Sequence, residues 1–158
     1  MRIIVPFLLL SILFITSCGG GSSVSPPHDL TGLMGNWEYH RDDQDVIVHA
    51  TGGDVVFPTF YYDAWVIDQS RIKRPGYQDL LDWEYDGKVL KVTEPFEMGI
   101  DDAECGICSA TGTIRWTIPI EYGATEATMS GVGDVSLTTE SCGNGSATFN
   151  VTGSLTKD

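Results

Sequence analysis

A period of two in the apolar residues is the feature that most limits how this chain can fold. From residue 30 to 158, apolar side chains alternate with polar ones, as in Asn36–His40, and no stretch shows the spacing of an amphipathic helix. The clearest segment is Leu81–Val92, in which two alternating runs flank Asp86-Gly87. This dipeptide predicts a hairpin with a type I′ turn, whose two central residues both need a positive φ.

Short strand patterns recur along the chain, and turn residues separate them. Val, Ile, Thr and aromatic residues fill these segments, which is typical of strands. The sequence therefore predicts an all-β fold: an antiparallel barrel of about 8–10 strands, with a β-sandwich as the alternative. We expect an irregular loop over 94–109, and bulges or tight bends at the glycines inside strand patterns. The remaining predicted strands cover 45–49, 64–68, 111–118, 126–129, 132–138 and 147–156, and the glycines are Gly112, Gly131, Gly133 and Gly153.

The N-terminal segment differs in composition from the rest of the chain. Residues 1–17 contain one early positive charge and then an apolar run too short to span a bilayer, the pattern of an export signal. Residues 18–29 are rich in Gly, Ser and Pro, which predicts a flexible tether. The folded domain is then expected over 30–158.

Ile15-Thr16-Ser17-Cys18 resembles the bacterial lipobox. The resemblance implies that the Cys18 thiol receives diacylglycerol, that the chain is cut before it, and that acyl chains anchor the protein in a membrane. Gly19, rather than Asp, follows the cysteine, which favours the outer membrane of the cell envelope. The alternatives are an ordinary cleaved signal with an incidental cysteine, or an uncleaved anchor.

The chain is strongly acidic, with a net charge of −13. Its acidic residues are scattered, so we expect a solvated surface. This charge argues against nucleic acid and against a bare anionic lipid surface as partners, because both require clusters of Lys and Arg. The lipid anchor is therefore the expected contact with the membrane, and the sequence identifies no protein partner.

The start of the predicted domain carries a second resemblance. Gly35-Asn36-Trp37 is similar to the Gly-x-Trp motif that opens the first strand of lipocalins and of small bacterial lipocalin-like lipoproteins. The resemblance implies that Trp37 packs across one end of a barrel, with a basic side chain from a late strand over its ring. Lys157 and Arg115 are the candidates for that side chain.

Three cysteines remain once Cys18 is assigned to the anchor. In an oxidising compartment we expect a disulfide between Cys142 and either Cys105 or Cys108, with a Cys105–Cys108 bridge as the alternative. Cys105-Gly106-Ile107-Cys108 also has the CxxC spacing of redox pairs and zinc sites. A redox pair needs a helix N-terminus that the pattern lacks, and a zinc site would need Cys142 and either His40 or His49.

A run of carboxylates precedes Cys105. Oxygen ligands of this kind suit calcium, although the spacing does not follow an EF-hand loop. We therefore expect no metal or other cofactor and keep these residues as weak calcium candidates. They are Glu97, Asp101, Asp102 and Glu104. A second acidic segment, 42–45, fits a simple hairpin turn.

No nucleophile elbow, metalloprotease motif or phosphate-binding loop is found in the sequence, so we expect no enzyme, with CxxC redox activity as the alternative. Two functions remain. The first is binding of a small apolar or amphipathic ligand in the barrel, and the second is a structural or accessory role for a barrel filled by its own side chains. Candidate pocket residues are Tyr61, Tyr62, Trp65, Trp83 and Trp116.

Overall fold

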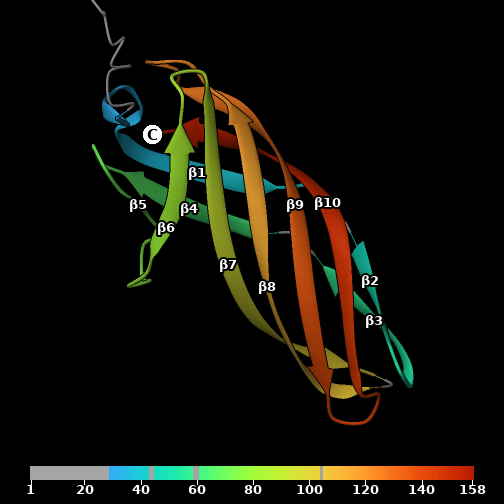
Figure 1. The fold of residues 1–158 in the computed structure, drawn as a ribbon. Helices are drawn as coiled ribbons and strands as arrows, with labels where there is room; N and C mark the ends of the chain where they lie inside the picture. Colours follow the sequence, from blue (N-terminus) through green and yellow to red (C-terminus); the bar gives the residue numbers. More distant parts are fainter. Residues whose placement is uncertain (1–28, 43–44, 59–60, 104) are drawn as a thin grey trace, which may run out of the picture.

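Alternation of buried and exposed side chains along the strands builds one antiparallel sheet in the computed structural model (Figure 1). The structure describes residues 29–42, 45–58, 61–103 and 105–158. The predictions for 1–17 and for Cys18 therefore lie outside the described residues. The elements are η1, a short 3-10 helix (Thr31–Leu33), β1 (Gly35–Arg41), β2 (Asp45–Ala50), β3 (Gly53–Pro58), β4 (Tyr61–Ile67), β5 (Ile72–Lys73), β6 (Leu80–Tyr85), β7 (Val89–Asp102), β8 (Gly106–Pro119), β9 (Glu126–Thr139) and β10 (Asn144–Lys157).

The sheet closes into a ring. Its strand order is β1-β4-β5-β6-β7-β8-β9-β10-β2-β3, and a further pairing of β1 with β10 completes a ring of eight strands. Strands β7 to β10 run side by side along the length of the molecule, and η1 lies at the same end as the C-terminus (Figure 1). The predicted antiparallel barrel is confirmed, and a single sheet closing on itself replaces the alternative of a two-sheet sandwich.

Strands β1 and β2 pair with different parts of the same strand, β10. The C-terminal part of β10 pairs with β1 from Trp37↔Lys157 to Arg41↔Gly153, and its first part meets β2 at Gly145↔Ala50. The prediction of a hairpin turn at 42–45 is therefore wrong, because β1 and β2 follow the same partner strand instead of folding back on each other. The 14-residue β10 is simply longer than either of them.

The hairpin between β6 and β7 is confirmed, with pairs from Asp82↔Thr93 to Tyr85↔Leu90. Its turn type was wrong, because Gly87 has φ +90° and no non-glycine residue in the described part of the chain has a positive φ. The Asp86 carboxylate accepts hydrogen bonds from the N–H groups of Lys88 and Val89. Asp86 thus precedes the turn, and a glycine alone at its first central position is the pattern of type II′.

The predicted loop over 94–109 is also wrong, because β7 continues to Asp102 and β8 begins at Gly106. Alternation explains the error. Phe96 and Met98 are partly buried on the inner face of β7, whereas Glu97 and Asp101 are exposed on the outer face. Water solvates the outer carboxylates, so the density of charge does not interrupt the strand.

Glycines inside the strands make room for aromatic rings. A Cβ on Gly133 would lie 2.2 Å from the Phe149 ring across the strand pair, and one on Gly112 would lie 2.4 Å from the Phe96 ring. Pairing continues without a break through both positions, so neither of these two glycines marks a bulge. These rings pack on Phe57, at centroid distances of 6.3 Å for Phe149 and 5.7 Å for Phe96.

The ring of eight strands is filled with large aromatic side chains. Trp37, Trp65, Tyr39 and Trp116 are all at most 1% exposed. The Tyr39 ring lies 5.1 Å from the Trp65 ring and 6.2 Å from the Trp116 ring, centroid to centroid. Contacts of this kind add to the stabilisation from burial alone.

Candidate functional site

A buried carboxylate lies in the middle of the barrel. Glu94, on the inner face of β7, is 2% exposed. Its Oε1 accepts a hydrogen bond from the Tyr39 hydroxyl at 2.7 Å, and its Oε2 accepts one from Trp116 Nε1 at 2.8 Å. Since two donors on β1 and β8 satisfy the carboxylate, the barrel tolerates its burial.

Two buried arginines accompany this carboxylate. Arg74, between β5 and β6, is 6% exposed and places Nη1 3.5 Å from Glu94 Oε1. Its guanidinium lies 4.1 Å from the centroid of the Tyr77 ring, and its buried Nε has no hydrogen-bond partner among the described residues. Arg41, on the inner face of β1, is 3% exposed. Burial of ionic groups is costly, so three buried ionic residues in one barrel require a structural or functional explanation.

A pocket of about 540 Å³ lies beside this cluster. Its wall combines the ionic groups with apolar side chains and with the backbone of two strands. The lining residues are Arg41, Arg74, Tyr77, Asp79, Glu94, Pro95, Phe96, Glu97, Met98, Thr111 and Gly112.

The pocket borders the half of β7 that has lost its pairing with β6. Strand β7 pairs with β6 only as far as Thr93, and in the described part of the chain β3 pairs with β2 alone. Beyond Thr93, therefore, β7 and β3 are not joined by strand pairing. Pro95, Phe96 and Met98, which line the pocket, belong to this second half of β7.

Comparison of the chain with protein-family models, with curated proteins and with solved structures gave no match. None of the helices that the structure describes is long and apolar enough to cross a membrane.

The three tryptophans predicted to line a pocket do not lie at the pocket beside Arg74. Trp65 and Trp116 are core residues, with exposures of 0% and 1%. Trp83 donates a hydrogen bond to the Ser70 carbonyl at 3.1 Å and, with Trp116, borders a second pocket of about 310 Å³. Tyr61 and Tyr62 pair with β1 through their backbones, and their side chains lie outside the description. Of the described residues, Trp65, Trp83 and Trp116 are not among those that line the pocket at Arg74.

The structure places Lys157, and not Arg115, at the Trp37 ring. Lys157 Nζ lies 5.6 Å from the ring centroid, within the range of a cation–π contact. Gly35 has φ +141°, and a Cβ there would lie 2.7 Å from Lys157 Cε, so the glycine makes room for the lysine stem. Arg115 instead forms an exposed ion pair with Asp134.

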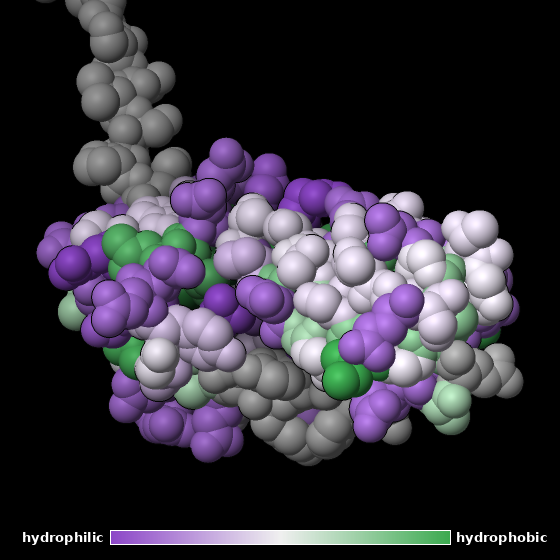
Figure 2. Space-filling model, turned by 90° about the horizontal axis from the view of Figure 1, so that it is seen from below, coloured by the Kyte–Doolittle hydropathy of each residue, from purple (hydrophilic) through white to green (hydrophobic). Residues whose placement is uncertain are grey.

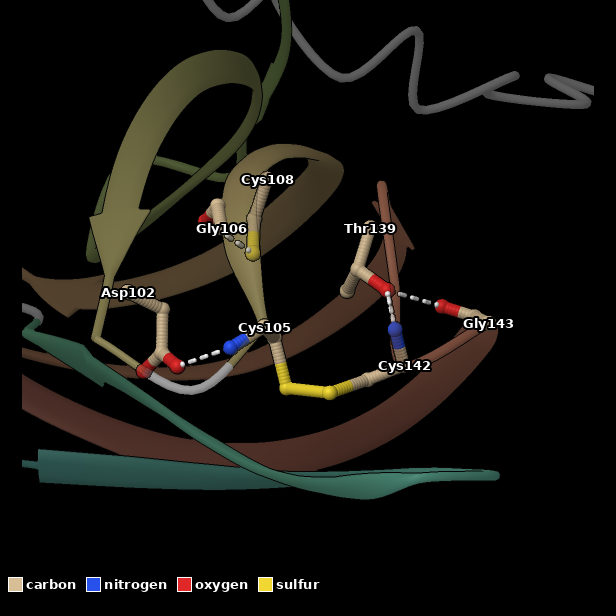
Figure 3. The surroundings of a disulfide bond; sticks show 7 residues. All are labelled: Asp102, Cys105, Gly106, Cys108, Thr139, Cys142 and Gly143. Atoms are coloured by element: carbon tan, nitrogen blue, oxygen red, sulfur yellow. Dashed lines mark hydrogen bonds between the residues drawn. A yellow bond between two sulfur atoms is a disulfide. The ribbon is translucent and has the colours of Figure 1, made fainter.

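A disulfide joins two hairpin turns (Figure 3), which lie at the end of the barrel away from the C-terminus (Figure 1). Cys105, before β8, is bonded to Cys142, before β10. The third turn at this end also packs here, since Gly52 N–H donates to the Cys142 carbonyl at 2.8 Å. Of the pairings that the sequence left open, the structure contains the bridge from Cys105 to Cys142.

Cys108 lies in β8, is fully buried and is free, because Cys105 is bonded to Cys142. Its Sγ lies 3.3 Å from the Gly106 carbonyl (Figure 3). Burial raises the pKa of this thiol, and the nearby carboxylates of Asp102, Glu140 and Asp101 raise it further. The thiol is therefore held in its protonated, weakly nucleophilic form.

The candidate metal ligands are separated. Cys142 is consumed by the disulfide, and His49 Nδ1 lies 2.7 Å from Asp54 Oδ1 on the outer surface. Asp102 Oδ1 accepts a hydrogen bond from the Cys105 N–H. Glu104 lies outside the description, and the described residues contain no group of three ligands able to hold a metal ion.

The ionic cluster was missed from the sequence, although one signal was present. Leu90, Val92, Glu94, Phe96 and Met98 occupy every second position, so a carboxylate stands where the alternation requires an inward side chain. Arg74 offers no such signal, because it lies in a turn whose path the sequence does not determine.

Proposed function

We propose that this protein is a lipid-anchored lipoprotein of the bacterial cell envelope whose barrel binds a small amphipathic ligand in the pocket beside Arg74. The observation that carries the proposal is the pocket itself. Its volume of about 540 Å³ falls in the usual range of small-molecule sites, about 300–1,000 Å³.

The composition of the wall supports this proposal. Phe96, Met98 and Pro95 offer apolar surface, and the buried ionic groups of Arg74 and Glu94 lie beside them. Ligand sites typically combine a mostly apolar wall with a few fixed polar groups. On the face shown in Figure 2, hydrophilic residues are spread widely and hydrophobic ones form small separate groups, which favours a small-molecule site over a broad apolar docking surface.

The anchored part of the proposal rests on the lipobox-like sequence ending at Cys18. Growth of the expressing bacterium with an alkyne-tagged fatty acid is expected to label the protein, and Cys18→Ala is expected to abolish the label. Fractionation of the envelope then tests the expected outer-membrane location. A wild-type protein that carries no label would contradict the anchor.

The binding part is tested by native mass spectrometry of the protein purified from its own host. We expect a retained small molecule. Met98→Trp, which introduces a bulky ring into the pocket, should remove it, whereas Val132→Trp, at an exposed outer position of β9, should not. A wild-type protein that never carries a ligand would contradict ligand binding.

A second candidate function has one observation in its favour. The ring of eight strands is filled by Trp37, Trp65, Trp116 and Tyr39, as in a barrel that acts only as a scaffold. This reading implies a structural or accessory envelope role through protein contacts. It predicts that Met98→Trp leaves the envelope phenotype of the host unchanged, whereas substitutions on the outer surface alter it.

A further inference from the structure

We infer that the ligand of this pocket is an amphipath with an anionic head group, and that Arg74 binds the head. This inference rests on the proposed function and deepens it, because it assigns the chemical class of the ligand. The alternatives that it excludes are a neutral and a cationic head group.

The first support is the incomplete pairing of Arg74. A guanidinium has five N–H donors, and buried donors normally find acceptors. Here the contact between Arg74 Nη1 and Glu94 Oε1, at 3.5 Å, is too long for a good hydrogen bond, and Nε has no partner among the described residues. A group that is 94% buried and lines a pocket thus retains donor capacity.

The second support is that the nearby carboxylate is already engaged. Tyr39 and Trp116 each donate a hydrogen bond of normal length to Glu94. Glu94 therefore does not need Arg74 to satisfy its oxygens. A ligand carboxylate or phosphate would accept two parallel hydrogen bonds from a guanidinium, the geometry that favours Arg over Lys.

The third support is the distribution of charge. The chain has 22 acidic and 9 basic residues, yet the two buried arginines of the described part, Arg41 and Arg74, both line this pocket. The other acidic groups of the wall, Asp79 and Glu97, are exposed to solvent. Of the three buried charged side chains of the wall, two are positive and one, Glu94, is negative, so the buried part of the wall has an excess of positive charge in an otherwise acidic molecule.

The apolar chain of the ligand has a place beside the head. Phe96 and Met98 follow Glu94 along the inner face of β7 at every second position. The Phe96 ring lies over Gly112 and packs against the Phe57 ring. A head group at Arg74 would direct its chain along these side chains.

The experiment compares probes that share one apolar chain and differ in the head. Protein processed by its bacterial host is placed in nanodiscs, and empty nanodiscs measure the partitioning of each probe into lipid. The probes are dodecanoate and dodecyl phosphate, methyl dodecanoate, and dodecyltrimethylammonium. Calorimetric titration should give at least 10-fold tighter binding for an anionic probe than for the neutral and cationic ones. The stronger of the two anionic probes then identifies the head group.

Variants tie the preference to Arg74. Arg74→Met is expected to weaken binding of the preferred anion by roughly 10- to 100-fold, the equivalent of one charge-assisted interaction, and to leave the neutral ester unchanged. Arg115→Met, which removes an exposed arginine of the outer surface, should have no effect. If Arg74→Met does not fold, Arg74→Lys keeps the charge and is expected to weaken anion binding less, through loss of the two parallel hydrogen bonds.

The outcomes distinguish failure of ligand binding in the pocket from failure of the anionic head group alone. If no probe binds the wild type better than it binds Met98→Trp, the pocket is not a binding site and the proposed function fails. If probes bind in a way that Met98→Trp blocks, but equally for all heads or best for the cation, the pocket binds ligands and the anionic inference is overturned. Anion preference that survives both Arg74 variants would also overturn it.

Discussion

Arg74 and Glu94 form a buried ion pair, with Nη1 of the arginine 3.5 Å from Oε1 of the glutamate. The pair joins the segment between β5 and β6 to the inner face of β7, while Tyr39 and Trp116 connect the same carboxylate to β1 and β8. A single side chain thus links four parts of the barrel wall. Removing a buried charge that lies next to another buried charge is costly. Substitution of Glu94 is therefore a sensitive test of this ion pair.

Glu94→Gln is expected to lower the free energy of unfolding by about 3–5 kcal/mol, because it removes the negative charge that faces buried Arg74 and leaves an oxygen for only one of the two donors. Urea unfolding measures the loss. The matched control is Glu97→Gln, three residues along β7 on the exposed face, which should change stability by no more than about 0.5 kcal/mol. Equal effects of the two substitutions would contradict the ionic role of Glu94.

Gly133→Ala is expected to destabilise the protein by about 1–3 kcal/mol, because the new Cβ would overlap the Phe149 ring at 2.2 Å. Gly99→Ala in β7 is the control, since a Cβ there meets nothing within 4 Å, and it should be neutral or stabilise by about 0.4–1 kcal/mol. Thermal unfolding provides the measurement. In the double variant Gly133→Ala, Phe149→Leu, the loss of stability should differ from the sum of the losses in the two single variants. A loss equal to that sum would disprove the contact.

Loss of the disulfide is expected to cost about 4 kcal/mol, the chain-entropy value for a loop closed by cysteines 37 positions apart. Cys142→Ala should lower the urea midpoint, and wild-type protein treated with a reductant should match it. Cys108→Ala removes a buried thiol but no crosslink, so we expect a smaller loss of roughly 1 kcal/mol. Peptide mapping that found a bridge between Cys105 and Cys108 would refute the pairing.

The Cys108 thiol is expected to resist alkylation in the folded protein and to react once urea unfolds it. Burial raises its pKa above the unfolded value of about 8.5. The stability that this shift represents is fully present below pH 8.5 and is lost as pH rises through the folded-state pKa, since the unfolded thiol ionises first. Urea midpoints measured across this range should fall with pH more steeply in the wild type than in Cys108→Ala.

Much of the fold could be predicted from the sequence, because alternation reports directly which face of a strand is buried. Asn36–His40 and Leu81–Val92 show this pattern clearly, and both form strands in the barrel. The errors arose where charge or glycine was taken as an interruption. Glu97 and Asp101 lie on the water-facing side of β7, and Gly133 makes room for Phe149 within a continuous ladder.

The candidate site was less accessible from sequence because its parts are brought together only by closure of the barrel. Arg41, Arg74 and Glu94 come from β1, the segment after β5, and β7, and the strand register that aligns them is not encoded locally. The aromatic residues first considered for a pocket are large enough to fill a narrow barrel, and Trp65 and Trp116 do so. Side-chain type alone does not separate core from pocket.

The seam between β3 and the second half of β7 has a consequence for motion. In the described part of the chain, no ladder of backbone hydrogen bonds joins these two edges, so their separation costs side-chain contacts only. The edges of β3 and β7 can thus move apart beside the pocket while the hydrogen-bond ladders of β8 and β9 stay intact. Hydrogen exchange would register this as rapid exchange of the seam-facing amides of β3 and β7 against slow exchange in the central strands.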